Sequence, residues 1–163
     1  EDENKFKYYL NEKRNPISIN NKLDNINIIV ETDKENYNNT LSIFKRANVI
    51  LKNNRAIENE YIDSVLEREK FSSTYIGNGI AIPHGNPEKV LQSHIIIFKS
   101  KKDIKWKQYN VNLVFFLAIS KKDLAIAKRF IQSIAQLSEI EVKKMINLSD
   151  KQIKDNLVNL IKE

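Results

Sequence analysis

The sequence predicts an α/β fold in which a mixed, mostly parallel sheet of about five strands is sandwiched between helical layers. Residues 93–98 and 112–119 are nearly continuously apolar and rich in β-branched and aromatic residues, as is typical of strands covered on both faces. Segments with helical periodicity precede and follow them, so helices can cover both sides of such a sheet. At 163 residues the chain has the size of one domain with one core.

The first half of the chain offers one strand and two helices. Residues 1–24 are polar and lack sustained periodicity, so we expect a leader or linker before a domain that spans residues 25–163. Residues 26–30 are a strand candidate. Thr32 or Asp33 can cap a helix that ends at Asn53 and Asn54. Its apolar face would comprise Tyr37, Leu41, Phe44, Ala47 and Leu51. A second helix over residues 58–70 would turn Tyr61, Ile62, Val65 and Leu66 inward.

The second half begins with a very short strand, residues 80–82, which Pro83 ends. After the two long strands, helices are expected over residues 123–137 and 139–147, and from a Ser149 or Asp150 cap to residue 161. A basic segment connects the long strands and holds Lys99, Lys101, Lys102, Lys105 and Lys107, with Trp106 and Tyr109 among them. We interpret it as an exposed connection. The less favoured alternative is a surface that stacks and neutralises single-stranded nucleic acid.

Composition excludes several classes of site. The chain has no cysteine, which rules out disulfides, thiolate zinc sites and cysteine nucleophiles, and fits a reducing interior. Its net charge is +6, but 21 acidic residues are interleaved with 27 basic ones, as on ordinary solvated surfaces. The longest apolar run, residues 113–119, is far shorter than the roughly 20 residues of a membrane span. A first residue of Glu1 rather than methionine suggests a fragment of a longer protein.

The most informative segment is residues 77–87. It contains all three glycines, two of the three prolines and His84, one of only two histidines. Glycine is used where the backbone takes positive φ or approaches another group closely, and proline where φ is fixed. The neutral imidazole is nucleophilic near neutral pH because its unperturbed pKa is about 6.5. The pattern predicts a nucleophilic histidine on a rigid turn.

This segment also carries a family resemblance. Residues 65–85 read Val-Leu-Glu-Arg-Glu-Lys-Phe-Ser-Ser-Thr-Tyr-Ile-Gly-Asn-Gly-Ile-Ala-Ile-Pro-His-Gly. They resemble the signature of enzyme IIA domains of the mannitol/fructose class in the bacterial phosphoenolpyruvate-dependent sugar phosphotransferase system. The combination of an Arg-Glu pair, a Ser/Thr turn, Gly-x-Gly and Ala-Ile-Pro-His-Gly is specific, and a weaker likeness extends over residues 26–162.

The resemblance implies a phosphoryl-transfer role in the cytoplasm. His84 would take a phosphoryl group from the phosphohistidine of the carrier HPr and pass it on, commonly to a cysteine of an enzyme IIB domain. Arg68 matches the family's active-site arginine, and its fork of donors suits charge spread over three oxygens. Further donors to phosphate would come from Ser72, Ser73, Thr74 and the amides near Gly85. No metal or other cofactor is expected, since transfer between histidines needs none and the sequence offers no convincing ligand set.

One departure from the family pattern bears on the biological role. Many such domains carry a second histidine after the last long strand, but residues 120–128 contain none, and Ala127 is the best match to that position. His94 heads a strand, does not match the motif and needs no ligand. Enzyme IIA-like domains also occur in transcriptional antiterminators and activators. We therefore predict the sensory domain of a transcription regulator, with other domains of a parent chain as partners. The alternative is a transport component that passes phosphate to enzyme IIB.

Overall fold

The computed structural model describes residues 25–31 and 37–162. The expected leader, residues 1–24, and the expected caps Thr32 and Asp33 lie outside the described residues. Five strands form one sheet in the order β1-β4-β5-β3-β2. β1 pairs with β4, and β3 with β5, in parallel, whereas β4–β5 and β2–β3 are antiparallel. The strands are β1 (Asn27–Glu31), β2 (Tyr75–Gly77), β3 (Ile80–Ala81), β4 (His94–Trp106) and β5 (Tyr109–Ala118).

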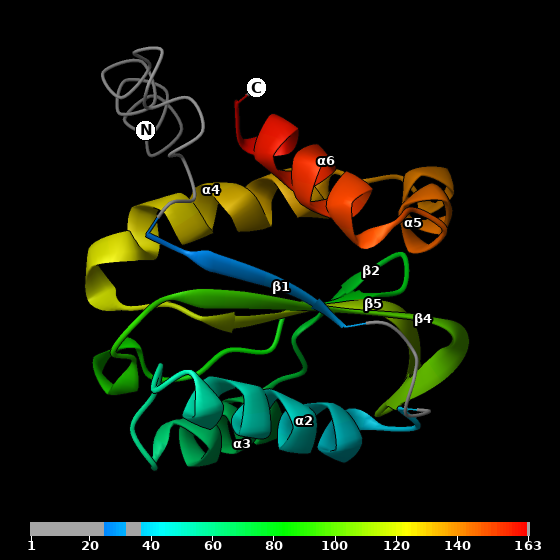
Figure 1. Cartoon of the computed structure of the whole chain (residues 1–163). Helices are drawn as coiled ribbons and strands as arrows, with labels where there is room; N and C mark the ends of the chain where they lie inside the picture. The colour runs from blue at the N-terminus through cyan, green and yellow to red at the C-terminus, as the bar shows by residue number, and fades with distance from the viewer. Residues whose placement is uncertain (1–24, 32–36, 163) are drawn as a thin grey trace.

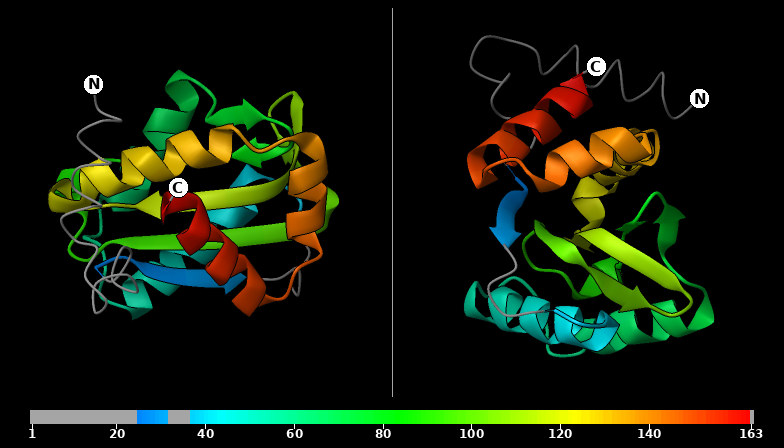
Figure 2. Two further views of the ribbon diagram at one scale, coloured as in Figure 1. Left: turned by 90° about the horizontal axis from the view of Figure 1, so that it is seen from above. Right: turned by 90° about the vertical axis from the view of Figure 1, so that its right-hand side faces the viewer.

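Helices cover both faces of this sheet, which confirms the predicted architecture (Figures 1 and 2). One layer consists of α2 (Thr40–Asn53) and α3 (Tyr61–Phe71). The opposite layer consists of α4 (Leu124–Ala135), α5 (Glu139–Ile146) and α6 (Asp150–Lys162). In the connections between the described elements lie the 3₁₀ turns η2 (Pro87–Lys89) and η3 (Lys121–Asp123). Among the helices of the described residues, none combines the length and apolar character that a membrane span requires.

The alternation of side chains along β4 divides the core between the two layers. Ile95 and Ile97 belong to the apolar cluster that includes residues of α4, α5 and α6. Ile96 and Phe98, which point to the other face, belong to the cluster with α2 and α3. All four side chains are fully buried. The continuous apolar runs of the sequence therefore mark strands buried on both faces, as predicted.

Helix α2 begins later than the sequence analysis expected. Asn39 caps it: the Asn39 side chain accepts a hydrogen bond from the Ser42 amide (2.9 Å), and Ser42 Oγ accepts one from the Asn39 amide (3.3 Å). Tyr37 is buried but precedes the helix, and Leu41 is half exposed rather than part of the apolar face. The helix ends at Asn53 as predicted.

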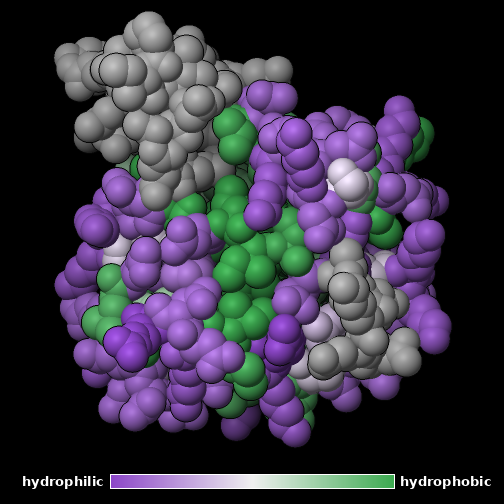
Figure 3. All heavy atoms as spheres, viewed as in Figure 1, coloured by the Kyte–Doolittle hydropathy of each residue, from purple (hydrophilic) through white to green (hydrophobic). Residues whose placement is uncertain are grey.

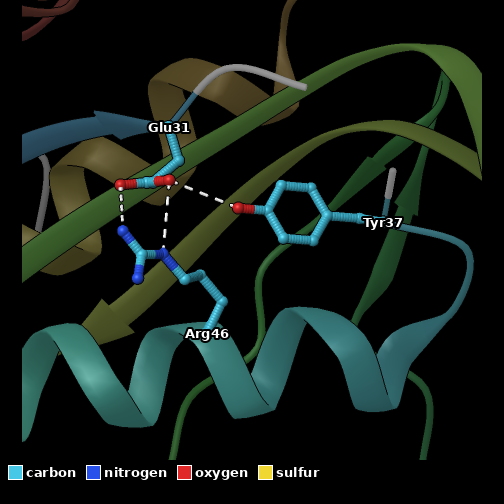
Figure 4. Close-up of polar contacts among 3 residues, drawn as sticks. All are labelled: Glu31, Tyr37 and Arg46. Carbon is cyan, nitrogen blue, oxygen red and sulfur yellow. Dashed lines mark hydrogen bonds and ion pairs between the residues drawn. The ribbon is translucent and has the colours of Figure 1, made fainter. Parts of the chain in front are cut away.

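The edge strand β1 is tied to α2 by polar contacts of Glu31 (Figure 4). Arg46 donates to both carboxylate oxygens of Glu31 through Nε (3.4 Å) and Nη2 (3.2 Å). The hydroxyl of Tyr37 donates to the same carboxylate at 3.2 Å. Figure 3 shows a band of apolar side chains across the face on which β1 lies. The half-buried Ile28, Ile29 and Val30 belong to this strand and pack against the two cores.

The basic segment is part of a β-hairpin, so the interpretation as a connecting loop is wrong. β4 continues to Trp106, which pairs with Tyr109 across a turn where Lys107 has a φ of 56°. Trp106 is fully buried, and Tyr109 stacks on Tyr75 of β2 with ring centroids 4.2 Å apart. Neither ring is therefore an open platform for a nucleic-acid base. Strand β2, which the sequence analysis did not predict, forms the far edge of the sheet.

Candidate functional site

His84 lies where β3 leaves the sheet. It forms an isolated parallel bridge with Leu117 of β5, in which the Leu117 amide donates to the Pro83 carbonyl at 2.9 Å. The side chain is half-buried, and its Nδ1 lies 2.8 Å from the carbonyl oxygen of Ile82. Because a carbonyl can only accept, this contact places the proton of the neutral ring on Nδ1. The lone pair on Nε2 is then available as a nucleophile.

Helix α3 holds the backbone that follows His84. The Gly85 amide donates to the hydroxyl of Tyr61 (3.0 Å), and the Asn86 amide donates to Ser64 Oγ (2.9 Å). A Cβ on Gly85 would clash with Ser64 Oγ and would lie 2.9 Å from Val65 Cγ2. Glycine is needed here for a close approach between the turn and the helix. Helical periodicity predicts that Tyr61 points inward, but it predicts no role for the Tyr61 hydroxyl or for Ser64, because both contacts are tertiary.

Arg68 follows Ser64 by four residues, so the two side chains share one face of α3. The Arg68 side chain is half-buried, and its Nη1 donates to the carbonyl oxygen of Ser72 at 2.7 Å. Within residues 25–31 and 37–162, no other hydrogen bond or ion pair of Arg68 is found. Its remaining guanidinium donors can therefore serve an anion that approaches this face.

The other sequence-predicted donors differ in their availability. Ser72 is exposed at the end of α3, and Ser73 Oγ accepts a hydrogen bond from the Tyr75 amide (3.2 Å). Among the described residues, no acceptor for the Ser73 hydroxyl proton is found. Thr74 is buried: its amide and hydroxyl both donate to the Glu69 carboxylate, at 2.8 and 2.6 Å. The amide of Gly85 is likewise taken by Tyr61. The structure thus gives Thr74 and the Gly85 amide protein partners in place of the expected phosphate.

Glu69, the residue after Arg68, is buried and accepts several hydrogen bonds. In addition to the two bonds from Thr74, its carboxylate accepts a hydrogen bond from Trp106 Nε1 at 3.1 Å. Lys107 donates to the Glu69 carbonyl at 2.8 Å. These contacts join the end of α3 to the tip of the β4–β5 hairpin. They fix the helix turn that carries Arg68, a function that the Arg-Glu pair in the sequence did not reveal.

Ala127 and His94, the two positions considered for the family's second histidine, are both buried. Ala127 is buried in α4 within the core, and contributes no titratable group. His94 is buried, with Nδ1 2.8 Å from the Gln92 carbonyl and Nε2 3.3 Å from the side-chain nitrogens of both Asn27 and Asn54. Burial lowers the pKa of His94, so the neutral ring is favoured. In the part of the chain that the structure describes, no group of three His, Asp or Glu side chains is placed to hold a metal ion.

Comparison with known proteins finds a matching family model and relatives of similar sequence. Residues 22–163 match the family model described as "Phosphoenolpyruvate-dependent sugar phosphotransferase system, EIIA 2". Over 83 residues the chain is 39% identical to the transcriptional regulator ManR of Bacillus subtilis. The aligned segment is 51% of this chain and 13% of that protein. Over 62 residues it is 44% identical to the mannitol-specific phosphotransferase enzyme IIA component of Geobacillus stearothermophilus, which covers 38% of this chain and 41% of that protein. The matched segments thus span less than half of these relatives.

Solved structures share the fold. The crystal structure of IIA mannitol from Escherichia coli superposes with a TM-score of 0.62 at 19% identity, over 83% of this chain and 96% of that one. A complex of enzyme IIA and phosphorylated enzyme IIB for mannitol, also from Escherichia coli, gives a TM-score of 0.63 at 18% identity, over 83% of this chain and 94% of that one.

Proposed function

Because the chain belongs to the EIIA 2 family of the phosphoenolpyruvate-dependent sugar phosphotransferase system, we propose that it is a phosphohistidine carrier. In this proposal His84 accepts a phosphoryl group from the phosphohistidine of HPr. The observation that carries it is the anchored imidazole: Nδ1–H donates to Ile82 while the half-buried ring keeps Nε2 for the incoming group. The helix that contacts the His84 turn also presents Arg68.

The transfer follows from this arrangement. The Nε2 lone pair of His84 forms the new nitrogen–phosphorus bond as the bond to the donor's nitrogen breaks, and the donor ring leaves with that electron pair. His84 keeps its Nδ1 proton throughout, and the Ile82 carbonyl stabilises the positive charge that the ring gains. Arg68 balances the charge on the phosphoryl oxygens. The hydroxyls of Ser72 and Ser73 are the remaining candidate donors from the turn after α3.

The test is phosphorylation with phosphoenolpyruvate, enzyme I and HPr. His84→Ala should take up no label, whereas His94→Gln, which leaves His84 in place, should take up label as the unmodified chain does. Arg68→Gln should slow phosphorylation by about 10- to 100-fold, because a charge-assisted hydrogen bond contributes about 1.5–3 kcal/mol. Label uptake by His84→Ala equal to that of the unmodified chain would contradict the proposal.

For the biological role we favour the sensory domain of a transcription regulator in the cytoplasm, with residues 25–163 as the domain. The absence of a histidine at Ala127 and the identity to the regulator ManR support this reading. The identity to mannitol enzyme IIA components supports the alternative, a transport component that hands phosphate to enzyme IIB.

Onward transfer distinguishes the two roles. The phosphorylated chain is mixed with a mannitol-class enzyme IIB domain, and the rate of label transfer is measured. The same rate is measured for the Ala127→His variant, which places a histidine at the best match to the family's second histidine. A sensory domain should accept label from HPr normally but pass it to enzyme IIB slowly. Fast transfer by the unmodified chain would favour the transport role.

A further inference from the structure

The last backbone pairing of β3 with β5 is interrupted by a side chain. A parallel bridge such as His84–Leu117 is normally closed by two backbone hydrogen bonds, one on each side of the bridged residue. The first is present, from the Leu117 amide to the Pro83 carbonyl. On the other side the hydroxyl of Tyr61 stands between the partners: the Gly85 amide donates to it at 3.0 Å, and it donates to the Leu117 carbonyl at 2.5 Å.

The phenol is suited to this place. Tyr61 is the first residue of α3 and is 1% exposed, so its ring is held by the core. A phenol has one proton to donate and lone pairs to accept, which matches one carbonyl and one amide. Burial raises the pKa of Tyr61, outweighing the opposite effect of the Gly85 amide. The hydroxyl therefore keeps its proton, and the direction of both hydrogen bonds is fixed.

A second hydroxyl of the same helix continues the pattern. Ser64 Oγ accepts from the Asn86 amide at 2.9 Å and donates to the Tyr61 carbonyl at 2.6 Å. Consecutive backbone amides after His84 thus donate to two α3 side chains instead of continuing along β5. The chain leaves the sheet at His84, where the ring becomes half-exposed. Since Arg68 lies on the same helix, α3 both positions the turn that carries the His84 imidazole and carries the Arg68 guanidinium.

We propose that the hydroxyls of Tyr61 and Ser64 position His84 for phosphoryl transfer by holding the Gly85 and Asn86 amides off β5. The inference rests on the proposed function of His84 and adds two positioning residues to it. Neither hydroxyl contacts the phosphoryl group. Without the phenol oxygen, the Gly85 amide can bond directly to the Leu117 carbonyl, which draws the turn toward β5 and displaces the imidazole.

The main variant is Tyr61→Phe, which keeps the ring and removes both hydrogen bonds. The matched control is Tyr75→Phe, because the Tyr75 hydroxyl accepts a backbone amide from Gly79 (3.2 Å) at the opposite end of β3. Rates are measured at varied phospho-HPr concentration, alongside urea unfolding and the ¹⁵N shifts of the His84 ring. Tyr61→Phe should lower kcat by about 10- to 100-fold with little change in KM and should shift the His84 resonances.

Tyr75→Phe should leave kcat and the His84 resonances unchanged, although it too loses a hydrogen bond. Equal kcat values in Tyr61→Phe, Tyr75→Phe and the unmodified chain would overturn the inference. If Tyr61→Phe does not fold, Ser64→Ala decides, and unchanged kcat and His84 resonances there would overturn it. Failure of the proposed function is seen separately, because the unmodified chain would then take up no label at all.

Discussion

Replacing Gly85 by alanine tests how closely the His84 turn approaches α3. The added Cβ would lie 2.9 Å from Val65 Cγ2 and 3.0 Å from the Val65 backbone nitrogen, and would clash with Ser64 Oγ. A side-chain rotation cannot relieve the contact with a backbone atom. Overpacking of this kind costs about 1–3 kcal/mol. Displacing Ser64 from the Asn86 amide costs about 1 kcal/mol more. We therefore expect the free energy of unfolding to fall by about 2–4 kcal/mol.

The assay is urea unfolding, supported by thermal unfolding, where Tm should fall by about 4–16 °C for a chain of this size. A second background, Ser64→Ala, removes the atom that the new methyl group meets first. Gly85→Ala should cost about 1 kcal/mol less on that background, which a double-mutant cycle measures. Gly77→Ala is the control, because Gly77 has a φ of +102° and no neighbour within 4 Å of its Cβ position. Its cost arises from backbone strain and should not depend on Ser64.

Two outcomes would refute this reasoning. A Gly85→Ala variant with an unchanged urea midpoint would mean that the turn and the helix do not approach as described. The same cost on both backgrounds, with no coupling to Ser64, would mean that the destabilisation has another origin.

Three further predictions concern the rest of the fold. Burial lowers the pKa of His94 below its ordinary value, so the unfolded chain binds the proton more readily than the folded chain. The free energy of unfolding should therefore fall as the pH drops from about 6.5 through the folded-state pKa. Urea midpoints should show this pH dependence in the unmodified chain and lose it in His94→Gln. Trp106→Phe removes the indole donor to the buried Glu69 carboxylate and should cost about 1–3 kcal/mol in thermal unfolding; a cost below 0.5 kcal/mol would contradict this role. Asn39→Ala removes the capping box of α2 and should cost about 1 kcal/mol by urea unfolding, whereas Asn39→Asp should be nearly neutral.

Local patterns predicted most of the fold because they arise from local physics. Amphipathic periodicity predicts α3 to α6 to within three residues at each end, and apolar runs predict residues 94–98 of β4 and 112–118 of β5. The buried Ile104, Trp106 and Val111 lie outside these runs. The outer half of β4 was missed because its residues around Lys101 and Lys102 are exposed and polar, which resembles a loop. Strand β2 has only three residues, too few to show alternation.

The candidate site was predictable only in part. The clustering of glycine and proline predicts a functional role for His84, and the family motif predicts one for Arg68. The contacts that hold the turn have no local signal: the Tyr61 hydroxyl and its partner Leu117 are 56 positions apart. The sequence offers Thr74 as a phosphate donor through its hydroxyl or its amide, but both groups donate to the Glu69 carboxylate inside the fold. Residue type indicates what a side chain can bind, and only packing decides which partner it meets.

The strand order also governs how the chain acquires its shape. Trp106 and Tyr109 close the β4–β5 hairpin across two residues, whereas β1 meets β4 with partners 67 positions apart. Short loops close faster than long ones, so the hairpin should assemble first and offer its two edges to β1 and β3. Pulsed hydrogen exchange during refolding should find the Phe116 amide protected before that of Leu117, which donates to the Pro83 carbonyl. The turn that carries His84 would then be among the last parts of the molecule to mature.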